Sequence, residues 1–294
     1  MIDAGSALGL ELGTRVVAYE HRDVILYALA TGAQADELEL VFERELRVLP
    51  TYGLVHSLWG AEELRERGFW DSSSAVHGAQ RLEVLAPLPP RGSIEMAGRV
   101  VGVWDKGTAA VYDVEITCRY FRATSSIFAP GRGGWGGQRG PSTPRDPETR
   151  PSGRAKAATF FNQAALYRLT GDRHLIHIDP QAAEMLGQPR PILHGLCTLA
   201  VAVRALAALA GTHPCELIEC SARFSAPVLP GETIDLQTWP AAAGEGWRFA
   251  ASTERARVLS GGYIEFATAP ARSSGADADD GFLTQRRAQG VEAR

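Results

Sequence analysis

Four side chains that can carry out acid–base or metal chemistry lie close together in one short segment. This segment, YRLTGDRHLIHIDPQAA from Tyr167 to Ala183, places Asp172, His174, His177 and Asp179 within eight residues. An imidazole gains and loses a proton near neutral pH, and a neighbouring carboxyl group can orient it or exchange a proton with it. The segment is therefore a candidate for a metal site, a structural Asp–His pair or a proton-transfer dyad.

All four side chains are permitted metal ligands, but their spacing matches no established metal motif. The pattern is D-x-H-x-x-H-x-D, without an HxH or HExxH arrangement. Gly171 and Pro180 bracket the segment, and the letters LIHI favour extended structure over a helix that would place both histidines on one face. The sequence therefore does not predict a bound metal.

His177 stands between Ile176 and Ile178, so this part of the segment is expected to be partly buried. Buried aspartates and histidines need hydrogen-bonding partners, and Asp172 and His177 are available to each other. Such a pair can be purely structural. It can also hold one water, with one group accepting a proton while the other delivers a proton to a neighbouring carbon. Both interpretations stay open at this point.

The composition of the chain excludes several classes of function. Of its 294 residues, 45% are hydrophobic, and the net charge of -4 gives no strongly basic face, so nucleic acid is not an expected partner. The longest apolar run, from Ile192 to Gly211, contains His194 and Arg204 and suits a buried helix better than a membrane span. The first residues show no secretory signal, and the four cysteines lack CxxC spacing. We therefore expect reduced thiols in a cytoplasmic protein.

Two stretches differ in composition from the rest and predict the domain organisation. Residues 131–156 are crowded with Gly, Pro and Arg and are expected to form a long connection. Residues 273–294 are similar and are expected to form a mobile tail. The units between them are residues 1–130 and 157–272. The GRGGWGG motif in the connection lacks the GK[ST] of a P-loop, which favours a flexible bridge over a phosphate cradle.

The two halves of the chain repeat each other at a constant offset. VILYALATG in the first half matches AALYRLTG in the second, and RLEVLAPLPPRGSIE matches RFSAPVLPGETID. The matched pairs, each 140 residues apart, are Tyr27 and Tyr167, Pro87 and Pro227, and Ile94 and Ile234. Because separate matches share one offset, the sequence indicates an internal duplication.

Each half contains a short helical stretch, a longer apolar helix and then several strands separated by turn residues. The longer helices begin near Thr51 and Ile192, and the turn from Asp105 to Gly107 is typical of a hairpin. A helix that is apolar on most sides must be wrapped by another element. A curved antiparallel sheet around one central helix, the hotdog architecture, meets this need. The predicted fold is therefore α+β, a double hotdog with its two units side by side.

Several segments resemble the hydratase 2 or MaoC-like family. YRLTGDRHLIHIDP is similar to the family signature Y-x-L-S/T-G-D-x-N-P-L-H-x-D-P. PRPILHGLCTLA, RDVILYALATGA, VLPTYG, HGAQRLEVLAPLP and DKGTAAV resemble further segments of (R)-specific 2-enoyl-CoA hydratases, as in the hydratase domain of peroxisomal multifunctional enzyme type 2. The resemblance extends from about Arg22 to Ala267. It implies a double hotdog whose catalytic groups lie in the second half.

The resemblance assigns roles to individual residues. The family's catalytic Asp and His map to Asp172 and His177. The backbone N–H that polarises the thioester carbonyl maps to Gly195, where a helix start offers unpaired donors. Residues expected to bind substrate are Gly171, His174, Arg190 and His194. Arg190 is a candidate for the coenzyme A phosphates, because Arg offers forked donors.

The signature departs from the family where His174 and Leu175 replace the usual Asn-Pro. In the family this Asn is thought to position the catalytic groups by hydrogen bonding, and His is larger and can become charged. The departure motivates two alternatives to ordinary fatty-acyl hydration. One is a dehydratase or isomerase of a specialised acyl chain on coenzyme A or a carrier protein, and the other is a non-catalytic acyl-CoA binding protein.

The function that the resemblance implies is hydration of a 2-enoyl-CoA to an (R)-3-hydroxyacyl-CoA, or the reverse dehydration. Asp172 and His177 would activate one water, and the thioester would supply the electron sink, so no metal or redox cofactor is expected. The N-terminal unit has no GD-x-x-x-x-H pattern and is expected to shape a channel for the acyl tail. The expected partners are an acyl-CoA or acyl-carrier substrate and a second copy of the chain in a homodimer, without nucleic acid or membrane.

Overall fold

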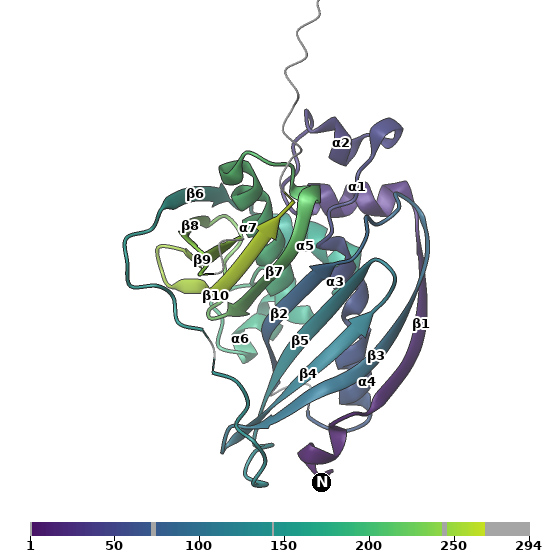
Figure 1. Cartoon of the computed structure of the whole chain (residues 1–294), viewed down its shortest axis with the longest axis vertical. Coiled ribbons are helices and arrows are strands. Elements are labelled where there is room, and N and C mark those ends of the chain that lie inside the picture. The colour runs from purple at the N-terminus through teal and green to yellow at the C-terminus, as the bar shows by residue number, and fades with distance from the viewer. Residues whose placement is uncertain (1, 72–74, 143, 243–245, 268–294) are drawn as a thin grey trace, which may run out of the picture.

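The computed structural model describes residues 2–71, 75–142, 144–242 and 246–267, so the expected mobile tail lies outside the described residues. The described strands form one antiparallel sheet, and Figure 1 shows it curving around helices. The strands are β1 (Glu11–Tyr19), β2 (Val76–Val84), β3 (Gly92–Asp105), β4 (Ala109–Thr117), β5 (Phe121–Pro130), β6 (Gly153–Ala158), β7 (Leu217–Phe224), β8 (Thr233–Pro240), β9 (Trp247–Ser252) and β10 (Arg257–Phe266). The α-helices are α1 (His21–Ala30), α2 (Leu38–Val41), α3 (Tyr52–Ser57), α4 (Trp59–Glu66), α5 (Gln163–Tyr167), α6 (Pro180–Met185) and α7 (Gly195–Ala210). Short 3-10 turns span Ala4–Ala7, Glu43–Glu45, Arg168–Thr170, Leu175–His177 and Pro214–Glu216.

The strand order shows two equivalent halves. It is β1-β3-β4-β5-β2-β7-β10-β9-β8-β6, so the second half repeats the first in mirror order about the β2–β7 pair. Each strand of the first half overlaps its counterpart when 140 is added to its residue numbers. The predicted double hotdog is therefore the observed fold, and the duplication extends through the whole sheet.

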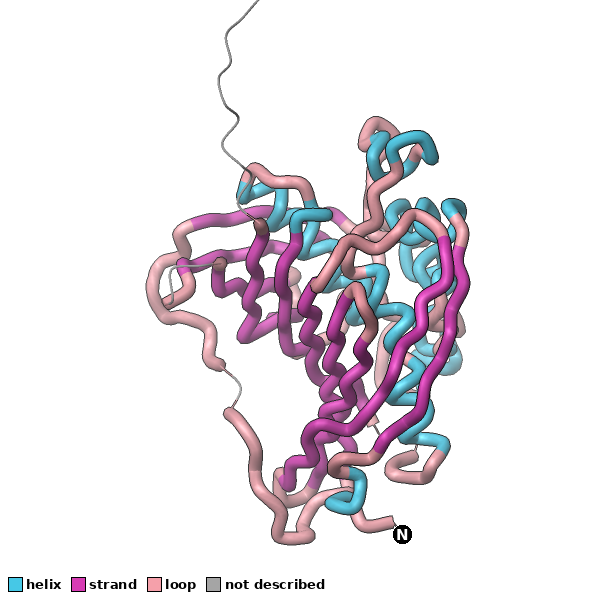
Figure 2. Tube along the Cα trace, turned by 45° about the vertical axis from the view of Figure 1, so that its right-hand side comes forward, coloured by secondary structure: helices cyan, strands magenta, loops and turns pink. Residues whose placement is uncertain are grey.

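The two halves meet along β2 and β7, which run antiparallel in the middle of the sheet. Leu82 pairs with Cys220 there, and both side chains are fully buried. Arg81 and Glu219 form an ion pair across the same strands at 3.0 Å. Figure 2 shows that the strands continue through this junction as one twisted surface. This seam places residues of both halves around shared cavities.

Each half of the sheet wraps a central helical segment. In the second half α7 is a continuous helix with most of its residues buried, and it ends at Gly211, whose positive φ of 68° suits a left-handed cap. In the first half the equivalent segment consists of α3 and α4, and Leu58 between them keeps helical backbone angles (φ -59°, ψ -29°). A Cβ on Gly60 would lie 2.6 Å from Ile116 Cδ1, so glycine lets α4 pack directly on β4.

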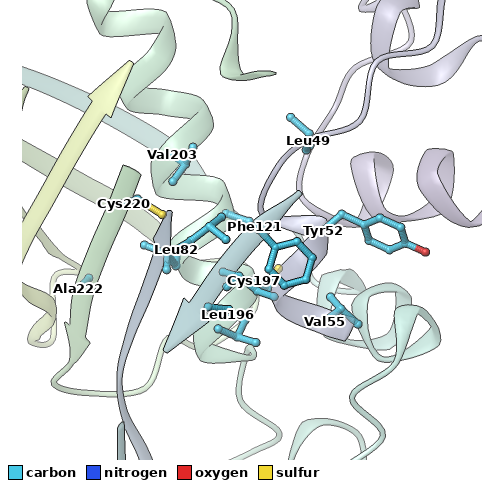
Figure 3. Close-up of a cluster of buried hydrophobic side chains, with 14 of the residues drawn as sticks. Leu49, Tyr52, Val55, Leu82, Phe121, Leu196, Cys197, Val203, Cys220 and Ala222 are labelled. Atoms are coloured by element: carbon cyan, nitrogen blue, oxygen red, sulfur yellow. The ribbon is translucent and has the colours of Figure 1, made fainter. Parts of the chain in front are cut away.

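The hydrophobic core extends across both halves. Figure 3 shows Tyr52 and Phe121 from the first half in the same cluster as Leu196 and Val203 from α7. The repeated tyrosines Tyr27 and Tyr167 also meet, with ring centroids 5.8 Å apart. The units therefore fold around one continuous core, and neither buries its apolar surface alone.

The connection between the halves is anchored by a carboxylate. Asp105 accepts hydrogen bonds from the backbone N–H groups of Gly107, Gly134 and Gly136, at 2.8–2.9 Å. These bonds hold the pKa of Asp105 below its ordinary value, and the bond from Gly134 has the largest effect. The glycine-rich motif thus surrounds a side chain of its own protein, which explains its composition without a phosphate. Further along, β6 begins at Gly153, inside the stretch expected as connection, and pairs with β8.

Two general expectations can be compared with the described residues. None of their helices combines the length and apolar character that a bilayer crossing requires. The four cysteines, which all lie in described segments, are free thiols.

Candidate active site

The segment that carries the candidate catalytic residues turns sharply at Gly171. Gly171 follows the 3-10 turn Arg168–Thr170 and has a φ of 157°. A Cβ at this position would lie 2.5 Å from Cγ1 of Val55 on α3. Only glycine allows this close approach, so Gly171 seats the following loop against the first half of the molecule.

Side chains fold the next residues into a compact loop. Asp172 Oδ1 accepts a hydrogen bond from the His174 N–H at 3.1 Å, and His174 Nδ1 accepts one from the Ile176 N–H at 3.3 Å. His174 thereby caps the 3-10 turn Leu175–His177. The expectation of extended structure for LIHI was wrong, because these local hydrogen bonds outweigh the β-propensity of the isoleucines.

His177 is buried and fixed by the backbone. Its Nδ1 lies 2.8 Å from the carbonyl oxygen of Ile192, and a carbonyl can only accept, so Nδ1 carries the proton. The other nitrogen, Nε2, is then free to accept a proton. Burial lowers the pKa of His177 below its ordinary value, and the nearby Asp172 opposes this only in part. The ring is therefore neutral at pH 7, as a general base requires.

Asp172 and His177 converge with a third group, His194. One carboxyl oxygen of Asp172 and one ring nitrogen from each histidine lie within 4.8 Å of one another. The rings of His177 and His194 stack with centroids 3.6 Å apart, and His194 Nε2 donates to the Asp172 carbonyl oxygen at 3.1 Å. Burial, then the neighbouring His177, lowers the pKa of His194 to about 3. His194 is therefore a neutral support for both residues.

This trio also consists of metal-ligating residue types, and it differs from the four side chains that lie close together in the sequence. Asp179 instead caps α6, where its Oδ1 accepts from the Gln181 N–H at 2.9 Å. His174 is exposed and accepts from the backbone. Asp179 and His174 therefore lie outside the trio, and His194, which is distant in sequence, completes it.

The candidate residues open onto a cavity of about 590 Å³. Asp172, His174, His177 and Gly195 are among its lining residues. The rest of the lining is largely apolar and comes from the first half of the chain and from β7 and β10, with Leu58, Ala61, Ile127, Phe224 and Leu259 among its residues. A mostly apolar pocket with a few convergent polar groups is typical of small-molecule sites.

Gly195 lies at the wall of this cavity as the first residue of α7. The first N–H groups of a helix have no partner in an earlier turn, so they can donate to a ligand. A Cβ on Gly195 would lie only 3.1–3.3 Å from the ring of Phe224. The helix start is therefore packed closely, and any side chain here would disturb Phe224 or fill the cavity.

The other residues predicted to bind substrate have varied positions. His174 lines the cavity, whereas Gly171 lines a neighbouring cavity beside α3. His194 supports the dyad from behind, and neither cavity includes it among its lining residues. Arg190 lines neither cavity, donates to the Pro230 carbonyl oxygen at 3.0 Å and lies over the ring of Phe161. Contact between Arg190 and a coenzyme A phosphate stays a prediction.

Sequence reasoning missed His77, which reaches the cavity from β2 in the first half. Its Nε2 is buried without a hydrogen-bond partner among the described residues. Its ring stands edge-on to Phe224 at 5.1 Å, and burial lowers its pKa to about 4 although Asp172 opposes the shift. The available signal in the sequence was a histidine within a strand. The pairing of β2 with β7 in the structure shows that its side chain reaches the cavity.

Two family models match the chain, and together they cover both halves. Residues 17–129 match the MFE-2 hydratase 2 N-terminal domain, and residues 142–258 match the MaoC like domain. The second match contains the candidate catalytic residues.

Named relatives and solved structures agree with these matches. The chain is 37% identical to an enoyl-CoA hydratase of Mycobacterium tuberculosis, covering 88% of this chain and 97% of the relative. It is 33% identical to the peroxisomal enoyl-CoA hydratase 2 of Arabidopsis thaliana, covering 84% and 90%. The crystal structure of a MaoC-like dehydratase from Phytophthora capsici superposes with a TM-score of 0.81 at 27% identity, covering 90% and 98%.

Proposed function

The chain belongs to the family of MaoC-like dehydratases and hydratase 2 enzymes, and from this premise we propose that it hydrates 2-enoyl-CoA thioesters to (R)-3-hydroxyacyl-CoA or catalyses the reverse dehydration. The observation that carries the proposal is the convergence of Asp172 and His177 at one cavity, with a carboxyl oxygen and a ring nitrogen within 4.8 Å. One water fits the role of a bridge between such groups, since each can hydrogen-bond to it. The enzyme is accordingly a hydro-lyase.

His177 and Asp172 share the proton transfers in this proposal. His177 Nε2 accepts a proton from the water while the oxygen adds to C3 of the substrate. A proton then reaches C2 through the same pair, so one H and one OH of a single water are added and the enzyme is regenerated. The hydrogen bond from His177 Nδ1 to Ile192 fixes the tautomer that this step needs.

The Gly195 N–H stabilises the charge that develops on the thioester carbonyl oxygen. It is the first residue of α7 and lines the same cavity as the dyad. A well-placed donor of this kind contributes roughly 3 kcal/mol to the transition state. The thioester itself delocalises the charge from C2, so the proposed reaction uses no cofactor other than the coenzyme A of the substrate.

Two further properties belong to the proposal. We propose a homodimer, as expected for a double-hotdog unit with free outer surfaces, and light scattering on purified protein tests it. We also propose a cytoplasmic location, which the free cysteines favour. The Arabidopsis relative is named as peroxisomal, so imaging of a tagged full-length chain is the appropriate test.

A direct assay tests the reaction. Crotonyl-CoA is incubated with the protein, loss of the conjugated thioester absorbance is followed, and the product's configuration is determined by chiral chromatography. We expect an (R)-3-hydroxy product, and we expect Asp172→Asn and His177→Gln each to abolish most of the rate. Activity that persists in both variants would reject the dyad, and no activity on any enoyl thioester would reject the reaction.

His174 favours one second candidate, a dehydratase of a specialised acyl chain. It lines the cavity, and because its Nδ1 accepts from Ile176, its Nε2 carries a proton that it can donate to a substrate. Comparing crotonyl-CoA with longer and carrier-bound 3-hydroxyacyl substrates, in the native protein and in His174→Asn, separates the two. A preference for carrier-bound substrates that is lost in the variant would support the second candidate.

A further inference from the structure

A second cavity, of about 380 Å³, adjoins the catalytic cavity and has no role in the reaction described above. We name it the α3 compartment, and its walls come from β1, α1, α3, the start of α4 and residues 169–171. Leu58 and Glu62 line both cavities. Gly171 lines the α3 compartment and the next residue, Asp172, lines the catalytic cavity. The two spaces therefore adjoin between the start of α4 and the catalytic loop.

The α3 compartment has an aromatic corner with a polar atom in need of a partner. The His56 ring stacks on Tyr19 with centroids 5.4 Å apart and stands edge-on to Tyr52 at 4.4 Å. His56 Nε2 is buried and has no hydrogen-bond partner among the described residues. A buried polar atom without a partner costs free energy, so a ligand that supplies a hydrogen bond after a small ring movement gains from it.

Charges in the α3 compartment limit the kind of group that fits there. Arg15 is its positive side chain, and Asp23 and Glu62 are its acidic ones. Burial lowers the pKa of His56 to about 4, so this ring is neutral at pH 7. A carboxylate would meet more negative than positive charge, whereas a neutral hydrogen-bonding group would meet no repulsion.

We propose that the α3 compartment receives the distal end of the acyl chain and selects for chains that carry a hydroxyl or ketone there. The reasoning rests on the proposed function, since the thioester end must lie at Asp172 and His177. The chain then passes the apolar wall of the catalytic cavity and crosses between Leu58 and the catalytic loop. Its distal oxygen hydrogen-bonds in the corner formed by His56.

Matched substrates test this proposal. The full chain is assayed with crotonyl-CoA, with plain enoyl-CoAs from octenoyl to hexadecenoyl, and with the ω-hydroxy analogue of each long substrate. We expect kcat/KM of the ω-hydroxy form to exceed that of the plain form by roughly tenfold at one or more lengths, the size of effect of a neutral hydrogen bond. If the ω-hydroxy form has no advantage at any chain length, the proposal is overturned.

Two variants, each with a matched control, locate the effect. Leu26→Trp fills the α3 compartment, and its control Leu29→Trp alters an exposed position of the same helix that lines neither cavity. The ratio of long-chain to crotonyl kcat/KM should fall roughly tenfold in the first variant and stay unchanged in the control. His56→Phe should bring the ω-hydroxy advantage close to one, whereas His21→Phe should preserve it.

The results separate this proposal from the proposed function. If crotonyl-CoA is hydrated but the long-chain ratio is unaltered in Leu26→Trp and the ω-hydroxy advantage is unaltered in His56→Phe, only the proposed role of the α3 compartment is overturned. If no hydration is detected, the proposed reaction is overturned. The role of the α3 compartment is then tested by calorimetric binding of saturated decanoyl-CoA and ω-hydroxydecanoyl-CoA. Equal affinities for the two would overturn that role. Unfolding midpoints show whether each variant is folded. If Leu26→Trp does not fold, the result for His56→Phe tests the proposal.

Discussion

The two halves share a strand order but differ where the active site lies. The position 140 residues before His177 is Glu37, and the one before Asp172 is Gly32. Glu37 is bound by the Arg204 guanidinium of α7 at 2.5–2.7 Å, so it ties the first half to the second and opens onto neither large cavity. One copy of the duplicated loop thus ties the two halves together, and the other carries the candidate catalytic residues.

The central helices differ in the same sense. Gly195 starts α7, while the position 140 residues earlier is Val55, which packs against Gly171. In the first half α3 and α4 meet at Leu58, and Leu58 and Glu62 lie at the junction of the two cavities. The two halves therefore share a shell of strands, and they differ at the few positions that line the cavity with the candidate catalytic residues.

The largest expected effect contrasts His177 with Glu37. His177→Gln should lower kcat/KM by about 10²–10⁴-fold, because the amide cannot take a proton from water. Glu37→Gln should leave kcat almost unchanged and destabilise the fold by about 1–2 kcal/mol, because Arg204 loses its carboxylate in a half-buried site. Steady-state kinetics and urea unfolding measure the two effects. Comparable loss of activity in both variants would show that the halves have not separated their roles.

A smaller effect is expected from Gly195→Ala. The added Cβ would press on Phe224 at 3.1 Å and move the helix start, so kcat should fall about 10- to 100-fold. Val55→Ala, at the equivalent position, should alter kcat far less. The measurement is kcat with saturating crotonyl-CoA, and an unchanged kcat in Gly195→Ala would contradict the expected displacement of the helix start, because alanine retains the backbone N–H.

The pH dependence of folding tests histidines from both halves. Folded His77 and His194 have pKa values lowered by burial to about 4 and about 3, while unfolded histidines titrate near pH 6.5. The unfolded chain thus binds more protons below pH 6.5, so stability is complete above this pH and decreases as the pH falls toward 4. We expect a decrease of roughly 1–3 kcal/mol per histidine in urea unfolding. In His77→Gln the free energy of unfolding should decrease less steeply as the pH falls. A pH dependence identical to that of the native protein would contradict the lowered pKa of His77.

The smallest effect concerns added metal. Asp172, His177 and His194 present ligand atoms within 4.8 Å, and the first half has Gly32, Glu37 and Leu54 at the equivalent positions. Added Zn²⁺ should therefore inhibit several-fold by occupying the dyad, and EDTA should restore the rate. His194→Phe should reduce the sensitivity to zinc. Activation by zinc would instead contradict the proton-transfer dyad.

The features that the sequence predicted well are local or repeated. The duplication was visible in pairs such as Tyr27 and Tyr167, and the structure brings this pair into contact at 5.8 Å. The convergence of Asp172 with His177 was also predictable, since only four residues lie between them in the chain. The LIHI turn was predicted wrongly because the His174 ring supplies a backbone cap that propensities do not include.

The sequence by itself indicated the fold class, because periodicity, turn residues and the repeat are properties of the chain. It also indicated the family and the segment with the candidate catalytic residues, because their signature motifs are contiguous and can be matched by resemblance. Only the tertiary structure decided that His194 stacks on His177, that His77 enters from the other half and that Glu37 is an anchor. These contacts join residues far apart in sequence through the β2–β7 seam and the start of α7. Their geometry depends on packing of the whole core, which no local pattern specifies.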